Sequence, residues 1–131
     1  MGRVFFNTRE NVHNLAAAYT VLASDSGKVF TIDQDATFVI TLPSDQEGLN
    51  YKFIVTDAGS GEVHIDSGAS NGIKGFSMDP TTGINAIDNN LVEIVASTAV
   101  IGDTVELVND GTTWWCKSFS SATNGIVGAN S

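Results

Sequence analysis

The sequence predicts an all-β fold, either a single-domain antiparallel β-sandwich or a small β-barrel, with an N-terminal arm. Two observations predict this fold class. Short segments alternate apolar and polar residues with the period of two that half-buried strands show. Tight turns rich in Asp, Ser and Gly end these segments, and only residues 14–19 tolerate a helix, of no more than one turn. At 131 residues, the chain is expected to form one domain with a single core.

Seven segments are predicted strands: residues 28–32, 37–42, 50–55, 62–66, 91–95, 103–108 and 113–117. Pro43 ends the second segment and a polar turn follows it, so the second and third segments are expected to pair antiparallel. Asp110 and Gly111 lie between the last two segments and are the strongest hairpin signal in the chain.

The inward positions of these strands define a predicted core. Its members are the large apolar residues that recur every second position. They are Phe30, Ile32, Phe38, Ile40, Leu42, Tyr51, Phe53, Val55, Val63, Ile65, Val92, Ile94, Val105 and Leu107.

Three segments lack the alternation. Residues 1–18 are predicted to be an arm and residues 120–131 a C-terminal tail, with the β domain spanning 19–119. Residues 67–90 are rich in Gly, Ser, Asn and Thr, and they are expected to form a long loop of the kind that is often functional.

The charge balance limits the classes of partner. Six Lys and Arg against fifteen Asp and Glu give a formal net charge of −9, which repels phosphate backbones and anionic lipids, so no nucleic-acid or membrane partner is expected. No apolar run is long enough for a signal peptide or a membrane helix. Cys116 is the only cysteine and is predicted to be a buried thiol on the strand face of Trp114.

The chain lacks a recognisable catalytic set. Its two histidines, His13 and His64, lie in different segments, with no nucleophile or orienting group at a motif spacing, so no catalytic residue is predicted and no enzyme is expected. His64 is predicted to face solvent. Asp57, Glu62 and Asp66 flank two turns and raise the possibility of a calcium site, but they lack the spacing of an EF-hand loop, so neither a metal nor a cofactor is predicted.

Trp114 and Trp115 occupy adjacent strand positions, so their side chains point to opposite faces of the sheet. One is expected in the core and the other exposed or at a subunit interface. Both are therefore candidates for an interface between subunits.

Several of these segments together resemble a small β module of tailed-phage virion proteins, which occurs in capsid decoration (cement) proteins and in head or tail fibres. The resemblance covers about residues 19–119. It rests on residues 19–30, 38–43, 48–53 and 102–111, followed by Trp114 and Trp115. Fibres usually embed such modules in much longer chains, whereas Met1 and Ser131 bracket a single copy, which favours a decoration protein.

The resemblance implies a non-enzymatic structural protein of the virion. Such a protein is assembled in the host cytoplasm, forms a homotrimer and binds the major capsid protein on the outer surface of the head, which it stabilises. An extended arm can add a strand to the edge of a capsid protein's sheet. The predicted capsid-binding arm contains Val4, Phe5, Phe6 and Arg9, and deletion of residues 1–14 is expected to leave the β domain folded.

Two alternatives remain open. The apolar residues Val4, Phe5 and Phe6 are equally consistent with a first core strand. The module is also consistent with a head- or tail-fibre receptor-binding protein, which would recognise a host glycan or protein through residues 67–90 and an exposed Trp.

Overall fold

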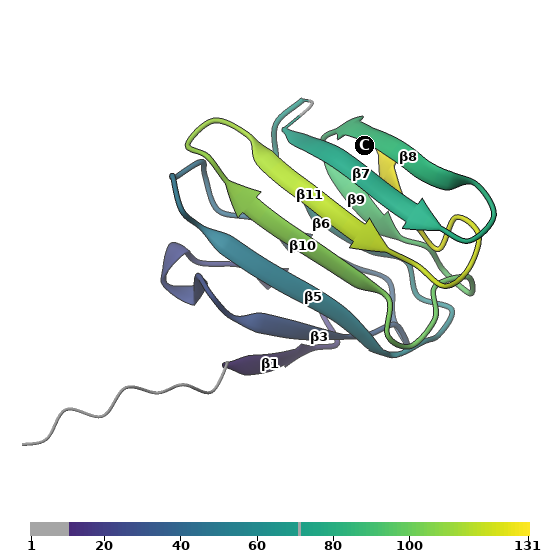
Figure 1. The fold of residues 1–131 in the computed structure, drawn as a ribbon. Helices are drawn as coiled ribbons and strands as arrows, with labels where there is room; N and C mark the ends of the chain where they lie inside the picture. The colour runs from purple at the N-terminus through teal and green to yellow at the C-terminus, as the bar shows by residue number, and fades with distance from the viewer. Residues whose placement is uncertain (1–10, 71) are drawn as a thin grey trace, which may run out of the picture.

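The structure is a computed structural model that describes residues 11–70 and 72–131 (Figure 1). It contains two mixed β-sheets packed face to face, which confirms the predicted β-sandwich. The seven-stranded sheet A has the order β1-β3-β5-β10-β11-β7-β8, and the five-stranded sheet B has the order β12-β9-β6-β4-β2. The strands are β1 (Val12–Leu15), β2 (Tyr19–Thr20), β3 (Val29–Asp33), β4 (Phe38–Thr41), β5 (Asn50–Asp57), β6 (Val63–Asp66), β7 (Ile73–Asp79), β8 (Gly83–Asn89), β9 (Leu91–Ile94), β10 (Thr104–Asn109), β11 (Trp114–Phe119) and β12 (Ile126–Ala129).

The first six strands alternate between the two sheets, so the chain winds around the core from one sheet to the other. We call this winding segment, β1 to β6, the coil. β1, β3 and β5 pair in parallel in sheet A, and β2, β4 and β6 pair in parallel in sheet B. The predicted antiparallel pairing of residues 37–42 with residues 50–55 is therefore wrong, because β4 and β5 lie in opposite sheets. Alternation specifies which face of a strand is buried, and that face is buried equally well against a neighbour in the opposite sheet.

The second half of the chain completes both sheets, mainly through antiparallel pairs. β10 and β11 form the predicted hairpin, in which Asp110 Oδ1 accepts hydrogen bonds of 2.9 Å from the backbone N–H groups of Thr112 and Thr113. β9 pairs antiparallel with β6 and β12, whereas β7 pairs in parallel with β11. The only helical element in the described residues is a 3₁₀ turn at Ala23–Asp25. No helix in this part of the chain has the length and apolar character needed to cross a membrane.

The prediction of a long loop at residues 67–90 is wrong for most of that segment, because the segment contains the antiparallel pair β7 and β8. Its inward positions include Ile73 and Ile87, which are buried. Gly75 interrupts the alternation of apolar and polar residues in β7. It has a positive φ of 139°, and a Cβ there would collide with the backbone carbonyl oxygen of Cys116. A strand that needs glycine at a close backbone approach does not show a clean alternation.

Parts of the predicted arm and tail belong to the sandwich. Residues 12–15 form β1 at the edge of sheet A, where Leu15 is buried, and residues 126–129 form β12 at the edge of sheet B, where Ile126 is buried. The arm residues Val4, Phe5, Phe6 and Arg9 lie outside the described residues.

The core lies between the two sheets and contains every predicted member. All fourteen predicted core residues are at most 6% exposed. Trp114 joins them and packs against Tyr51 with a distance of 5.8 Å between ring centroids. Gln34 is fully buried, and its side-chain Nε2 donates to the carbonyl oxygen of Gly61 at 3.0 Å, so it links the end of β3 to the segment that precedes β6.

Candidate functional site

The two tryptophans separate as predicted, because Trp114 is 1% exposed and Trp115 is 47% exposed. Of the two interface candidates, only Trp115 therefore reaches the surface. Its indole N–H donates a 2.8 Å hydrogen bond to Asp110 Oδ2, and Val108 lies directly opposite on β10 and is half exposed. This hydrogen bond is the main cause that lowers the pKa of Asp110, with further help from the N–H groups of Thr112 and Thr113.

A second apolar group lies at the other end of the same outer face. Phe119 on β11 is opposite Met78 on β7, and Met78 is opposite Ile84 on β8, so the three side chains form a row across three strands. Phe119 and Ile84 are 43% and 70% exposed. Met78, Phe119 and Pro80 line a shallow hollow of about 430 Å³.

Charged residues separate the two apolar groups. Lys52 and Lys117 flank Glu106, with Nζ to carboxylate distances of 3.6 and 3.8 Å. Lys74 on β7 is opposite Trp115 and forms a closer ion pair of 2.7 Å with Asp88 on β8, so this pair extends the row that contains Trp115. The outer face of sheet A, defined by Val108, Trp115, Phe119, Met78 and Ile84 around these ion pairs, is thus a mixed surface with large exposed apolar side chains.

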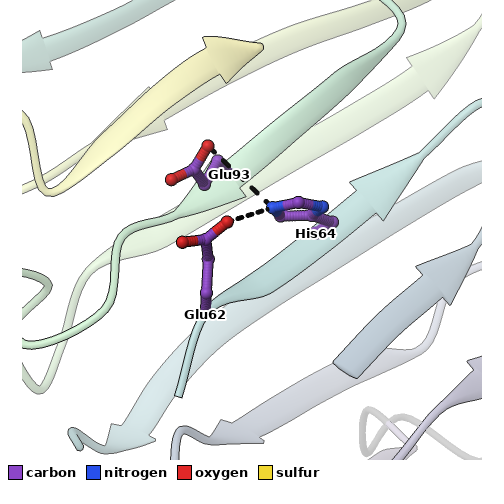
Figure 2. A group of neighbouring side chains, drawn as sticks. All are labelled: Glu62, His64 and Glu93. Carbon is purple, nitrogen blue, oxygen red and sulfur yellow. Dashed lines mark hydrogen bonds and ion pairs between the residues drawn. The ribbon is translucent and has the colours of Figure 1, made fainter. Parts of the chain in front are cut away.

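The outer face of sheet B carries a different group, formed by Glu62, His64 and Glu93 (Figure 2). His64 Nε2 lies 2.6 Å from Glu62 Oε1 and 3.9 Å from Glu93 Oε2. His64 was predicted to face solvent, and it does lie on the outer face, but its side chain is only 28% exposed and contacts both carboxylates. We call these three residues the Glu-His-Glu cluster.

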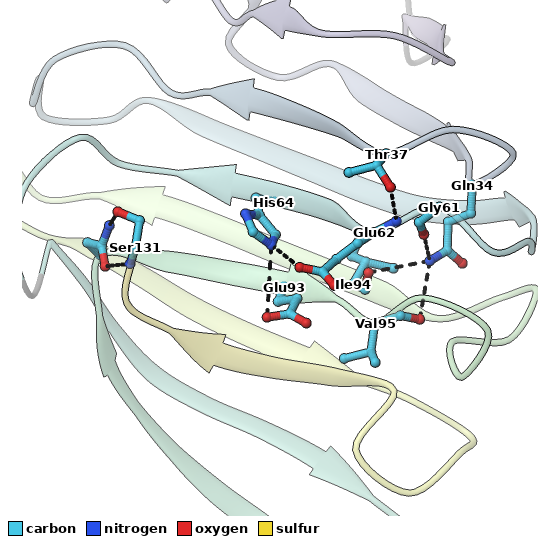
Figure 3. A network of polar contacts seen from close by, with 10 residues as sticks. Gln34, Thr37, Gly61, Glu62, His64, Glu93, Ile94, Val95 and Ser131 are labelled. Atoms are coloured by element: carbon cyan, nitrogen blue, oxygen red, sulfur yellow. Dashed lines mark hydrogen bonds and ion pairs between the residues drawn. The ribbon is translucent and has the colours of Figure 1, made fainter.

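Neighbouring strands partly cover the cluster. Val39 on β4 lies beside His64, and Val127 on β12 lies beside Glu93. Burial is the largest cause that raises the pKa of Glu93, and the charge of Glu62 adds to it, while His64 opposes it. Figure 3 shows that Glu62 is also anchored through its backbone N–H, which donates to Thr37 Oγ1 at 3.1 Å.

The carboxylates considered for calcium from the sequence do not come together. Asp57 lies with Asp33 and Asp35 on an exposed part of the coil, Glu62 belongs to the Glu-His-Glu cluster, and Asp66 accepts a 2.7 Å hydrogen bond from the N–H of Gly68. The charge of Asp33 is the largest cause that raises the pKa of Asp35, followed by that of Asp57. These three aspartates are an exposed acidic group without a ligand of any other type.

Sequence reasoning did not identify Glu93 as a partner of His64. The spacing of Glu62 and His64 is visible in the sequence as two positions on one face of a strand. Glu93 joins them through the pairing of β6 with β9, in which it is directly opposite His64. That register depends on the tertiary fold, and no local signal in the sequence specifies it.

The buried thiol of Cys116 is on the inner side of β11, as predicted, and burial raises its pKa to about 12. It is therefore protonated at neutral pH and a poor nucleophile.

No family model matches the chain, and no curated protein or solved structure matches it either.

Proposed function

We propose that the protein is a non-enzymatic structural protein of a phage virion, a capsid decoration (cement) protein that binds the outer capsid surface and stabilises the head. The observation that carries this proposal is the outer face of sheet A, where Val108, Trp115, Phe119 and Ile84 are each 43–70% exposed. Grouped exposed apolar side chains of this size are typical of a surface that binds another molecule, and the net charge of −9 favours a protein over an anionic membrane.

The composition of this face suits a contact between subunits. Aromatic residues and Met are enriched in protein interfaces, and Trp is the side chain that most often dominates their binding energy. Trp115 is held in place by Asp110, so little side-chain entropy is lost when a partner covers its exposed face. We assign the outer face of sheet A to the interface of a homotrimer.

Attachment to the major capsid protein is assigned to the N-terminal arm with Val4, Phe5, Phe6 and Arg9. These four residues precede β1, which is an edge strand of sheet A and so leaves one row of backbone groups unpaired by this sheet. Strand addition between such an edge and a capsid protein would supply main-chain hydrogen bonds. A specific contact of this kind buries about 800 Å² on each partner, and spanning adjacent capsomers would oppose their separation.

Sedimentation velocity of the full chain at micromolar concentration tests the trimer. The wild type is expected to sediment as a trimer and Trp115→Ser as a monomer, because the substitution removes the largest exposed aromatic side chain. Val39→Ser is the matched control, since Val39 is 41% exposed on the outer face of sheet B, opposite the proposed interface, and it should remain trimeric. A monomeric wild type would contradict a preformed trimer.

Co-sedimentation with heads of the phage that carries the protein tests the cement function. The full chain is expected to bind heads and to raise the temperature at which they open, whereas a chain lacking residues 1–10 should stay folded and fail to bind. Equal binding by the shortened chain would exclude the arm as the attachment element. Heads that bind no full chain would contradict the proposed function.

One observation favours the receptor-binding alternative. A polar hollow of about 560 Å³ lies at one end of the sandwich, lined by Asp66, Gly68, Ala69, Ser70, Asn90, Asn130 and Ser131. Carboxylate, amide and hydroxyl groups of this kind suit a glycan. Glycan-array binding that is lost in Asp66→Ala, together with absence from heads, would favour this alternative over cementing.

A further inference from the structure

We propose that the Glu-His-Glu cluster of Glu62, His64 and Glu93 is a binding site for a divalent transition-metal ion, with Zn²⁺ as the expected ion. The site does not depend on the proposed function, because it lies on the outer face of sheet B, opposite the surface assigned to subunit contact.

The backbone geometry places three ligand groups in a triangle. Glu62 immediately precedes β6 and His64 lies within it, two positions apart, so both project from one face. Glu93 is directly opposite His64 on the antiparallel neighbour β9. One imidazole nitrogen and one oxygen from each carboxylate lie within 4.8 Å of one another, so a single ion can contact all three after small rotations of the side chains.

A single hydrogen on His64 cannot join the imidazole to both carboxylates. His64 Nε2 carries at most one hydrogen, and it lies 2.6 Å from Glu62 but 3.9 Å from Glu93, beyond hydrogen-bond distance. Within the described residues, no donor side chain or backbone group forms a hydrogen bond with the Glu93 carboxylate. An ion at Nε2 would contact both carboxylates at once, which one hydrogen does not do.

The charges of the cluster favour a divalent cation. The four lysines of the described residues form ion pairs with other carboxylates: Lys28 with Asp25, Lys52 and Lys117 with Glu106, and Lys74 with Asp88. Glu62 and Glu93 therefore share only His64 as an ionisable partner in this part of the chain. Two carboxylates and a neutral imidazole balance the charge of one M²⁺ ion. Val39 and Val127 on either side reduce screening by water.

The ligand types select the class of ion. An imidazole nitrogen suits Zn²⁺ and other first-row transition metals, whereas Ca²⁺ and Mg²⁺ prefer all-oxygen sites. Three protein ligands leave at least one coordination position for water or for a group from another molecule. The aspartates Asp33, Asp35 and Asp57 contain no imidazole and are not included in the proposal.

Isothermal titration of the chelator-treated full chain with ZnCl₂ tests the site, and Co²⁺ titration followed by visible absorption reports coordination directly. We expect one strong Zn²⁺ site per chain. His64→Gln and Glu93→Gln should each weaken binding at least about tenfold. His13→Gln and Asp57→Asn are matched controls at the other histidine and the other acidic group, and both should retain wild-type affinity.

A readout on the wild-type chain guards against misfolded variants. On addition of Zn²⁺, the NMR signals of the His64 ring should shift while those of His13 stay in place. Wild-type protein that binds no Zn²⁺ at millimolar concentration would overturn the proposal. Equal affinity in the wild type, His64→Gln and Glu93→Gln, or a shift confined to His13, would overturn it as well. None of these outcomes bears on trimer formation or on binding to heads.

Discussion

The two outer faces of the sandwich differ far more than its two inner faces. Both inner faces are apolar, with Phe53 in sheet A and Ile65 in sheet B almost completely buried. The outer face of sheet A combines exposed aromatic side chains with lysines that pair with carboxylates. The strands of sheet B contain no lysine, and their outer face carries the Glu-His-Glu cluster. Packing constrains the inner faces alike, whereas each outer face is free to acquire its own binding chemistry.

Alanine substitutions on the two inner faces are expected to change the free energy of unfolding the most, and they test whether the two faces contribute equally. Phe53→Ala and Ile65→Ala remove buried side chains from sheets A and B, and each should lower the free energy of unfolding by about 2–5 kcal/mol, with Phe53→Ala at the upper end. Val39→Ala, on the outer face of sheet B, should change it by less than about 1 kcal/mol. Chemical denaturation measures all three. An unchanged midpoint for Phe53→Ala would remove that residue from the core.

A pair of deletions gives the next largest effect and sharpens the boundary of sheet A. Removing residues 1–10 should leave stability unchanged, whereas removing residues 1–14 deletes most of β1 and exposes the edge of β3. We expect the longer deletion to lower the free energy of unfolding by about 1–3 kcal/mol. A domain boundary at residue 18 predicts no loss for either deletion, so equal denaturation midpoints would support that boundary and contradict a structural role for β1.

The smallest effect concerns Glu93, whose pKa is raised in the folded protein. A carboxyl group of this kind contributes stability that is present below its ordinary pKa and is lost as the pH rises through the raised value. With chelator present, Glu93→Gln should therefore be slightly more stable than the wild type at pH 7, by less than about 1 kcal/mol, and the difference should vanish at pH values below the ordinary glutamate pKa. Urea titrations at several pH values measure it. A variant less stable at pH 7 would mean that attraction to His64 outweighs the cost of burial.

The sequence predicted which side chains point into the core better than it predicted which strands pair with each other. The alternation at Phe53 and Ile65 reveals which side of a strand is buried, because burial on one face is a local requirement. It does not reveal that β4 and β5 lie in opposite sheets, since that choice depends on the path of the connecting segment. Gly75 concealed β7 because its backbone contact with β11 replaces a side chain.

The same distinction applies to the surfaces. Adjacent strand positions were enough to predict that Trp114 and Trp115 face opposite sides. The Glu-His-Glu cluster needs the register of β6 against β9, which is set by the fold as a whole. A single strand thus reveals its own two faces, and only the assembled sheet reveals which residues meet across it.

The alternating coil of β1–β6 has a consequence for how the domain opens. Each sheet receives every second strand of this half of the chain, so the covalent connections between consecutive strands tether the two sheets to each other along their length. The parallel pairs also join residues a full turn of the coil apart, so closing them costs more loop entropy than closing the β10–β11 hairpin. Backbone amides of β3 and β5 in one layer and of β4 and β6 in the other should therefore become accessible to hydrogen exchange in the same cooperative event.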